Sequence, residues 1–431
     1  MGKLKTIFIL FAFLFMASFI SGCARTENSS AKSLLNLSHL NHLYEDVFAD
    51  GRSMAIVNIY SDYPDYNPVE AKGEGIACVD DAARAAVFYL RYSRLTGDRE
   101  SQRKAKQLLE FLRFMQAPNG MFYNFVFRDL SINKTRHNSQ ARADWWTWRA
   151  VWALGEAVSY FRTSDPDYAR QLGADLHRTF PAIDSLLQKY PEKSMSAGIV
   201  YPDWLPGGSA ADQASELLMG LIPYYEVSGD STVGRMISLL ADGMQQMQAG
   251  DADNFPYGCL LTWQNEWHAW GSSQADMLLR AGSIMKRDDF VKSALITVEH
   301  FYPYLIKKNY LSQMSFRKNG NAVQLTESAP FPQIAYDIRP MVLASLEAYK
   351  VTGEARYAWQ AGEIAGWLLG KNSSGQPLYD PATGRCYDGI NNPGQINKNS
   401  GAESTIEALL TLLAVEQNPQ AQAELLSHLR K

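Results

Sequence analysis

The feature that most restricts the fold is a sixfold recurrence of short turn signals, at intervals of about 65 residues. These signals are Thr96-Gly97-Asp98, Ser164-Asp165-Pro166, Ser228-Gly229-Asp230, Lys286-Arg287-Asp288, Thr352-Gly353-Glu354 and Gln417-Asn418-Pro419. A run with helical periodicity precedes each signal, and a second helical run follows it. The pattern therefore predicts six helical hairpins, each closed by a short turn.

The two helices of each hairpin differ in character. The first is apolar around most of its circumference, in the runs 83–90, 148–155, 217–225, 277–284, 341–349 and 406–413. The second carries a charged side, as in 101–115 with Arg103, Lys104 and Lys106. A helix that is apolar all round is buried, whereas one with a charged face borders solvent. Six such hairpins bury a common core most simply as a closed ring, so we expect an all-α (α/α)6 toroid with inner and outer helices.

An open helical solenoid is the alternative architecture. Solenoids have atypical capping repeats and do not need long insertions at one end only. This chain has five long stretches rich in Gly, Pro, Asn and aromatic residues, at 117–142, 191–211, 250–272, 309–336 and 371–401. By connectivity all five reach the face where the inner helices begin, and loops of this length are usually functional. We therefore expect the functional site on that face.

An acidic residue stands at the start of nearly every predicted inner helix. These residues are Asp80, Asp81, Asp144, Asp212, Asp276, Asp337 and Glu403. Taken singly, each is typical of a helix cap. A closed ring would instead bring all of them to the mouth of one cavity, and concave sites with convergent polar groups are the usual ligand sites.

Aromatic residues in the long loops indicate a sugar ligand, because aromatic faces stack on sugar rings while carboxylates accept hydrogen bonds from hydroxyl groups. The alternative is that these aromatic residues only pack the loops against one another. The predicted substrate-binding residues are Asp80, Arg84, Asp144, Trp204, Trp263, Trp267, His268, Tyr336, Arg339 and Glu403.

Cleavage of a glycosidic bond needs one protonated carboxylic acid and one ionised carboxylate, about 5 Å apart for retention of configuration and about 6.5–9.5 Å apart for inversion. Helix N-termini favour the ionised form, so Asp81 and Asp337 are the predicted bases. Glu266 stands in a loop among tryptophans that would desolvate it and raise its pKa, so Glu266 is the predicted proton donor.

The first residues predict a secretion signal. Lys3 and Lys5 precede an uncharged apolar run, 7–20, which is short for a membrane-spanning helix. The small residues before Cys23 resemble the lipobox of bacterial lipoproteins, which implies cleavage after residue 22 and a lipid on the Cys23 sulfur. An ordinary signal peptide or a single membrane anchor is the alternative. We expect a signal peptide at 1–22, a lipidated linker at 23–33 and one toroid domain at 34–431, tethered at the cell envelope.

Composition argues against several other classes of protein. The formal net charge is −4 with both signs intermixed, so no basic stripe indicates binding of nucleic acid. Cys78, Cys259 and Cys386 are too dispersed for a disulfide framework or a zinc motif, although one disulfide is possible. The oxygen-rich stretch 380–399 lacks the spacing of the twelve-residue calcium loop and instead indicates Asx turns. We expect a monomer without a metal or other cofactor.

Several longer stretches carry a resemblance to known proteins. They are VDDAARA at 79–85, RAVWALGE at 149–156, YDIRPMVLASLEAYKVTG at 336–353, WLLGKN at 367–372 and LYDPATGRCYDGINNPGQINKNSGAEST at 378–405. Together they resemble the six-hairpin glycosidase-like superfamily, and most closely a bacterial group of uncharacterised toroid proteins found with mannoside- and glucan-processing enzymes. The resemblance implies an (α/α)6 toroid that acts on carbohydrate.

This sequence departs from that group at Ile338 and Arg339, where the resemblance implies two glutamines. Arg339 either pairs with Asp337 or contacts an acidic sugar. The superfamily includes hydrolases, lyases, epimerases and phosphorylases, so the fold alone does not select a reaction.

Three functions follow from these patterns. The leading hypothesis is a cofactor-free glycoside hydrolase, inverting, that acts on oligosaccharides or polysaccharides outside the cytoplasm. A polysaccharide lyase or sugar epimerase acting on uronates is the second, with Arg84, Arg142, Arg339, His268 and Tyr336 as the residues that would neutralise the carboxylate or move the proton. A glycan-binding lipoprotein without catalysis is the third.

Overall fold

The computed structural model describes residues 33–430. The predicted signal peptide, Cys23 and the linker up to residue 32 lie outside the described residues, and they stay predictions. Among the helices that the structure does describe, none has the length and apolarity that crossing a membrane requires.

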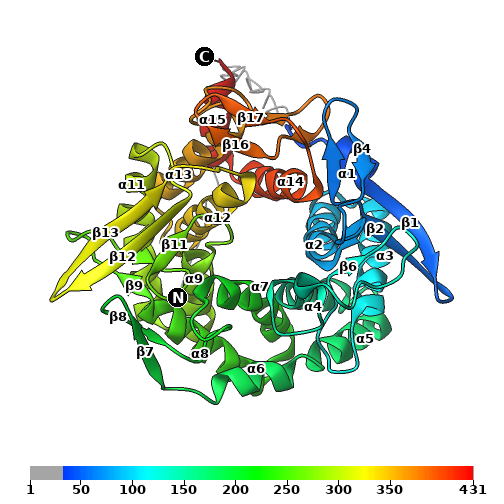
Figure 1. Cartoon of the computed structure of the whole chain (residues 1–431), viewed down its shortest axis with the longest axis horizontal. Coiled ribbons are helices and arrows are strands. Elements are labelled where there is room, and N and C mark those ends of the chain that lie inside the picture. The colour runs from blue at the N-terminus through cyan, green and yellow to red at the C-terminus, as the bar shows by residue number, and fades with distance from the viewer. Residues whose placement is uncertain (1–32, 431) are drawn as a thin grey trace, which may run out of the picture. The chain divides into compact units, whose positions relative to one another are not determined.

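Six helices form the inner wall of a ring, and their amino ends carry the predicted acids (Figure 1). They are α2 (Val79–Thr96), α4 (Trp145–Phe161), α7 (Ala211–Ser228), α9 (Gln274–Met285), α12 (Ala335–Thr352) and α14 (Ala402–Glu416). Each packs against the next, and α14 packs against α2. The ring is therefore closed, which confirms the predicted toroid and excludes the open solenoid.

The outer wall contains the second helix of each hairpin. Its helices are α3 (Arg99–Met115), α5 (Pro166–His177), α6 (Phe180–Leu187), α8 (Ser231–Gln246), α10 (Asp288–Ile296), α11 (Tyr302–Lys307), α13 (Ala355–Ala365) and α15 (Pro419–Ser427). A π-helix, Thr297–Phe301, joins α10 to α11. The 3-10 segments are His137–Ser139, Gly366–Leu369 and His428–Arg430.

The turn signals act as the sequence predicts. Gly97 and Gly353 end α2 and α12 in the left-handed conformation, which glycine adopts without steric cost. Asp98, Asp165 and Asp230 then cap the following outer helices by accepting hydrogen bonds from backbone amides. Helix end and helix start are thus encoded within three residues.

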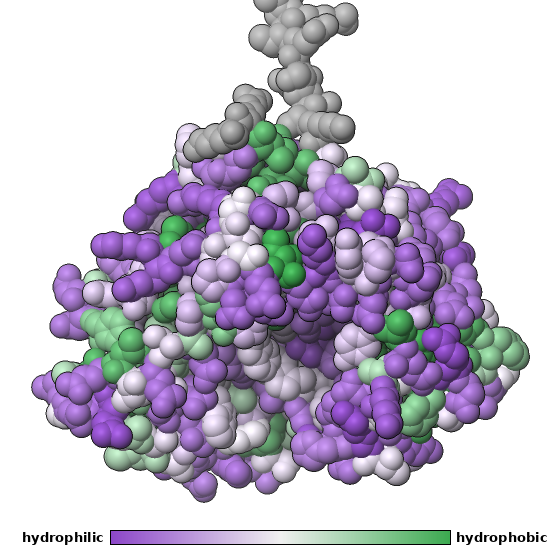
Figure 2. All heavy atoms as spheres, turned by 45° about the horizontal axis from the view of Figure 1, so that its top comes forward, coloured by the Kyte–Doolittle hydropathy of each residue, from purple (hydrophilic) through white to green (hydrophobic). Residues whose placement is uncertain are grey.

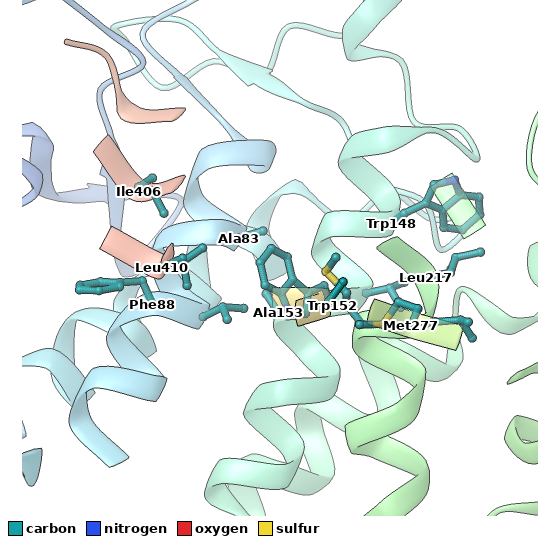
Figure 3. Close-up of a cluster of buried hydrophobic side chains, with 14 of the residues drawn as sticks. Ala83, Phe88, Trp148, Trp152, Ala153, Leu217, Met277, Ile406 and Leu410 are labelled. Atoms are coloured by element: carbon teal, nitrogen blue, oxygen red, sulfur yellow. The ribbon is translucent and has the colours of Figure 1, made fainter. Parts of the chain in front are cut away.

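The core lies where neighbouring inner helices meet. Figure 3 shows one part of it, in which buried side chains of five inner helices gather in one cluster. Ala83 and Phe88 come from α2, Trp152 from α4, and Ile406 and Leu410 from α14. All five are almost completely buried, which accounts for inner helices that are apolar on most sides.

Helices α4 and α7 approach so closely that their backbones touch. A Cβ added to Gly155 would lie 2.0 Å from the carbonyl oxygen of Gly220, and one added to Gly220 would lie 2.3 Å from that of Val151. No side chain fits between the two backbones, so both glycines are required for this contact.

We therefore expect Gly220→Ala to lower the free energy of unfolding by about 3 kcal/mol, because the new methyl group forces the helices apart. Gly173→Ala on α5 is the matched control, since its added Cβ would meet nothing closer than 4.0 Å. That variant should gain about 0.5–1 kcal/mol through helix propensity. Urea unfolding of both variants measures the difference, and equal stabilities would contradict the close approach.

The segment before the first helical hairpin and the long loops contain short antiparallel strand pairs, which the predicted all-α pattern did not include. The pairs are β1 (Tyr44–Ala49) with β2 (Arg52–Val57), β3 (Tyr60–Asp62) with β4 (Asn67–Val69), β5 (Ala77–Cys78) with β6 (Phe125–Val126), β7 (Lys193–Ser196) with β8 (Ile199–Pro202), β9 (Gln248–Ala249) with β10 (Cys259–Leu260), β14 (Tyr379–Asp380) with β15 (Arg385–Cys386), and β16 (Gly389–Asn392) with β17 (Gln395–Asn397). A three-stranded sheet joins β11 (Glu266–His268), β12 (Gln313–Asn319) and β13 (Ala322–Ala329).

A segment before the first hairpin also contributes to the mouth of the ring. It contains α1 (Ser38–Leu43) and β1 to β4, and it lies beside the loop that leads into α14 (Figure 1). The amide of Ala402 donates to the carbonyl of Ile59 at 2.8 Å, and the amide of Ser400 donates to that of Ser61 at 3.0 Å. Residues more than 300 positions apart thus form one wall.

Candidate functional site

A pocket of about 160 Å³ lies at the amino ends of α12 and α14. It is lined by Ile59, Tyr60, Ile334, Ala335, Tyr336, Asp388, Gly401, Glu403 and Ser404. On the face drawn in Figure 2, hydrophilic residues predominate and hydrophobic residues occur in small groups. The lining thus includes two of the predicted site residues, Tyr336 and Glu403.

Arg84 connects the carboxylates around this pocket. One of its terminal nitrogens, Nη1, donates to Asp81 at 2.8 Å, and the other, Nη2, donates to Glu403 at 2.7 Å. Its Nε lies 3.0 Å from Glu407 Oε1, close enough for an ion pair but without the angles of a hydrogen bond. The guanidinium is almost completely buried, whereas the Glu403 side chain is 45% exposed. Arg84 therefore orients the carboxyl group of Glu403 at the edge of the pocket.

Tyr336 stands at the centre of a second group of charges. Its hydroxyl donates to Glu216 and accepts from Arg149 Nη2 at 3.2 Å. Three guanidinium groups lie near its ring, at 4.8 Å for Arg84, 5.2 Å for Arg339 and 5.5 Å for Arg149. Cations near an aromatic ring are attracted by its quadrupole. The predicted binding residues Arg84, Tyr336 and Arg339 are thus in mutual contact.

The remaining links are ion pairs between neighbouring helices. Arg149 Nη1 donates to Asp80 at 2.5 Å, and Asn124 donates to the other carboxylate oxygen of Asp80 at 2.9 Å. Arg339 donates through Nε to Glu407 and not to Asp337, so the predicted alternative of an Asp337–Arg339 pair is not formed. Arg84 of α2 and Arg149 of α4 both reach Tyr336 of α12.

Asp337 is in a different state from Glu403. It is 4% exposed, and its Oδ2 accepts from the amide of Ile334 at 2.8 Å. Burial, together with the nearby charge of Glu403, raises the pKa of Asp337 well above its ordinary value. This direction is opposite to the one expected from the helix N-terminus, because desolvation outweighs the backbone hydrogen bond. The role of Asp337 as a base stays a prediction.

Asp81 shows the same effect to a smaller degree. Burial raises its pKa to about 6, although the ion pair with Arg84 opposes that rise. One oxygen of Asp81 is held by Arg84, and the other accepts from the Cys78 thiol at 3.3 Å. Both carboxyl oxygens of Asp81 are thus engaged in the buried wall, so the structure favours a role in positioning Arg84, and the role of Asp81 as a base stays a prediction.

The raised pKa of Asp81 predicts a pH-dependent stability. The folded state binds an extra proton between about pH 4 and pH 6, so this contribution is complete below pH 4 and is lost as the pH rises through 6. The free energy of unfolding of the wild type, relative to that of Asp81→Asn, should therefore fall by about 3 kcal/mol from pH 4 to pH 7. Urea unfolding at both pH values measures it. A constant difference would show that Asp81 keeps its ordinary pKa.

His268 lies at the amino end of α7, another part of the ring mouth. Its Nε2 lies 2.9 Å from Asp212 Oδ2, and its Nδ1 lies 2.9 Å from the carbonyl of Trp270. The imidazole also stacks on Trp270, with ring centroids 3.9 Å apart. Both imidazole nitrogens therefore already have an oxygen partner within hydrogen-bond distance.

Glu266 and Trp267 occupy neighbouring positions on β11 and point to opposite faces. Trp267 is buried and packs edge-on against Phe301. By strand alternation, Glu266 shares its face with His268. The role of Glu266 as proton donor stays a prediction, whereas Trp267 is corrected from a ligand platform to a core residue.

Other predicted residues lie outside the pocket. Trp204 is completely buried and donates from its indole to the carbonyl of Leu239 at 2.9 Å, so it packs the loop onto α8 and does not bind a ligand. Trp263 is 42% exposed but does not line the pocket. Asp144 caps α4 and pairs with Arg142 at 2.7 Å. Buried aromatic and exposed aromatic residues cannot be distinguished by loop position alone.

Five residues in or around the pocket were not predicted from the sequence to belong to the site: Arg149, Glu216, Glu407, Asp388 and Tyr60. Glu216 and Glu407 lie four residues after Asp212 and Glu403, one helical turn deeper on the same helix face. A charged residue within an otherwise apolar inner helix was the available signal. Tyr60 and Asp388 had no such signal, because they reach the pocket through tertiary contacts.

The stretch 380–399 folds into the hairpins β14–β15 and β16–β17, and it includes an Asx turn of the predicted kind at Asp380. Asp380 Oδ1 accepts from the amide of Ala382 at 2.9 Å, and Asp388 Oδ1 accepts from the amide of Gly401 at 2.8 Å. Within the part of the chain that the structure describes, no three His, Cys, Asp or Glu residues are grouped to hold a metal ion.

A larger cavity, of about 900 Å³, lies where the inner helices end. Its lining comes from the six inner helices and the turn after α14, so none of the long loops contributes to it. Its charges are largely paired, as in Arg91 with Glu156 at 3.1 Å and Arg280 with Asp276 at 2.9 Å. We therefore place the candidate site at the smaller pocket, which is lined by the half-exposed Glu403 and lies close to Asp337, a buried carboxyl group whose pKa is raised.

No protein-family model matches the sequence, and no curated protein sequence is significantly similar to it. Three solved structures illustrate the structural likeness. A sugar epimerase from a ruminal bacterium superposes with a TM-score of 0.62 at 13% identity, over 90% of this chain and 97% of that one. Cellobiose 2-epimerase from Bacillus thermoamylovorans B4167 gives 0.62 at 12% identity, over 88% and 96%. A family 76 glycoside hydrolase from a bovine Bacteroides thetaiotaomicron strain gives 0.51 at 11% identity, over 92% and 79%.

At these identities the likeness establishes the fold. It confirms the predicted (α/α)6 toroid.

Proposed function

We propose that this chain, which has the fold of the six-hairpin glycosidase-like superfamily, is a carbohydrate-active enzyme that hydrolyses a glycosidic bond at the pocket beside Glu403. Asp337 is the proton donor in this proposal, and Glu403 is the ionised carboxylate. The proposal replaces the sequence-based role of Asp337 as a base and makes Glu266 the competing donor.

The observation that carries this proposal is that two neighbouring carboxyl groups differ in their burial and in their charged partners. Asp337 is buried and has a raised pKa, whereas Glu403 is half-exposed and held by Arg84 at 2.7 Å. Two carboxyl groups whose environments separate their protonation states are the arrangement that glycosidases use. A neutral Asp337 can protonate the departing oxygen. Glu403 then acts on the attacking water or on the sugar itself.

The role of Glu403 depends on the mechanism. In an inverting enzyme it would remove a proton from the attacking water, and in a retaining enzyme it would attack the sugar itself. We retain inversion as the proposal from the sequence, and the anomer of the first product tests it. In either case Arg84 keeps Glu403 charged and oriented.

A sugar epimerase is the second candidate, and the contacts of Tyr336 favour it. Its hydroxyl lies between the guanidinium of Arg149 and the carboxylate of Glu216, which suits a group that gives and takes a proton. Two of the similar structures are also described as sugar epimerases. Elimination from a uronate has less support, because Arg84 and Arg149 already pair with carboxylates.

Product analysis on a panel of neutral and acidic oligosaccharides tests the proposal. Hydrolysis releases new reducing ends without absorbance near 235 nm. An epimerase leaves the chain length unchanged and incorporates deuterium at carbon from D₂O, whereas a lyase produces the absorbance. Binding without any product would identify a glycan-binding protein. Only the first outcome supports the hydrolase.

Location at the cell envelope is also a proposal, and it rests on the sequence before residue 33. We propose that Cys23 carries a lipid and that the domain acts as a monomer. Expression of the whole chain should place the wild type in the membrane fraction and Cys23→Ser outside it. Equal distribution of both would contradict the anchor.

A further inference from the structure

The walls of the pocket come from three distant parts of the chain. Ile59 and Tyr60 form one side, the start of α12 forms the second, and the residues around Glu403 form the third. The side chain of Asp388 joins the third wall together, since its Oδ1 accepts from the Gly401 amide at 2.8 Å and from Ser404 Oγ at 2.7 Å. The pocket is thus closed by fixed backbone and not by a mobile side chain.

The volume of the pocket limits the size of its ligand. Pockets for drug-sized ligands measure about 300–1,000 Å³, whereas this one measures about 160 Å³. Water occupies about 30 Å³ per molecule, so the pocket holds the equivalent of about five waters. That is room for one sugar ring. A Cβ on Gly401 would lie 2.8 Å from the Ile59 carbonyl oxygen, so the walls already touch at one end of the pocket.

The charge of the pocket limits the chemistry of its ligand. Glu403 and Asp388 contribute carboxyl groups, and none of the described residues lining the pocket is a lysine, arginine or histidine. Arg84 lies behind Glu403 with 1% of its surface exposed, and its charge is already shared among three carboxyl groups. An anionic sugar would meet carboxylates without a free cation to pair with it.

We infer that the pocket binds a single non-anionic sugar residue at the end of a glycan chain. This inference rests on the proposed function and adds the substrate class and the mode of attack. The enzyme then removes terminal residues, one at a time, and does not process uronates. Tyr60 supplies the aromatic face for that residue, since its ring is 37% exposed and its hydroxyl is fixed by donation to Glu74 at 2.9 Å.

Calorimetric titration of the whole protein with monosaccharides tests the ligand class without depending on catalysis. The probes are glucose, mannose, galactose and glucosamine, together with the uronic acids of the three hexoses, at pH 7. At least one non-anionic sugar should bind at least ten times more tightly than its uronic acid. Equal or tighter binding of the uronic acid, or no binding of any monosaccharide where a tetrasaccharide binds, would overturn the inference.

Variants test whether binding occurs in this pocket. Asp388→Asn retains an oxygen for the Gly401 amide but cannot ionise, so it should reduce the preference against the uronic acid at least threefold. Tyr60→Ala should weaken binding of the sugar about tenfold, in line with loss of a stacked aromatic ring. Phe48→Ala is the matched control, because Phe48 is 70% exposed and outside the pocket. Equal effects of Tyr60→Ala and Phe48→Ala would place the ligand elsewhere.

The products of an oligosaccharide labelled at its reducing end test the mode of attack. Terminal action releases unlabelled monosaccharide from the first minutes, and the labelled chain shortens by one residue at a time. Labelled fragments shorter by two or more residues at early times, without a matching release of monosaccharide, would overturn terminal action while leaving hydrolysis established. Binding of monosaccharides without hydrolysis of any chain would instead overturn the proposed function and leave the ligand class standing.

Discussion

Replacement of Asp337 with Asn should lower kcat/KM on a natural glycoside by about 10²–10⁴-fold, because an amide cannot protonate the departing oxygen. Asn retains an oxygen that can accept from the amide of Ile334, so the start of α12 should keep its structure. An aryl glycoside with a phenol of low pKa needs no proton donor, so its cleavage should fall much less. Steady-state kinetics on both substrates measure the difference.

Matched variants separate the two carboxyl groups. Glu403→Gln should lose activity on both substrates, since a good leaving group does not replace the ionised carboxylate. Asp230→Asn is the control, because Asp230 caps α8 at the far end of a hairpin and should leave both activities unchanged. Equal losses on the two substrates in Asp337→Asn would exclude Asp337 as the donor.

The pH profile gives an independent measure of the same role. Only protonated Asp337 is active as an acid, so kcat/KM should fall as the pH rises through the raised pKa of Asp337. That decline should be absent from Asp337→Asn. If the decline persists there and disappears in Glu266→Gln, then Glu266 is the donor, as the sequence predicts.

The fold was accessible from sequence because its determinants are local. Turn signals such as Thr96-Gly97-Asp98 and apolar runs such as 83–90 act within a few residues, and their sixfold recurrence determines the number of hairpins. The hairpin β16–β17 was not accessible, because strands of three or four residues carry no clear periodicity. The sequence therefore predicted the ring but not the strands that close its mouth.

The candidate site was also predictable only in part. The positions of Asp81, Asp337 and Glu403 at the starts of inner helices follow from helix boundaries. Their protonation does not, because it depends on burial by segments that are distant in the chain. Trp204 and Tyr60 show the same limit for aromatic residues, since the first is buried by α8 and the second is exposed beside the pocket. Ring closure explains why these acids lie close together. The packing of the loops around them determines their protonation.

Ring closure also requires that charges on adjacent inner helices neutralise one another inside the wall. Glu407 of α14 is completely buried between Arg84 of α2 and Arg339 of α12, and its carboxylate faces both guanidinium groups. The Nη1 and Nη2 atoms of Arg339 have no hydrogen-bond partner among the described residues, and its guanidinium lies 5.3 Å from the Trp152 ring. Glu407 thus pairs with Arg339 and is one of the three carboxyl groups that pair with Arg84.

Glu407→Ala should therefore lower the free energy of unfolding by about 3–5 kcal/mol, because it leaves buried charge uncompensated. It should also lower activity, since Arg84 would no longer be held against Glu403. Glu407→Leu combined with Arg339→Met removes charges of both signs and should be less destabilising than Glu407→Leu alone. Urea unfolding of the single and double variants measures the coupling. Additive losses would show that the two side chains act independently, and the ring would then owe its closure to apolar packing without this ion pair.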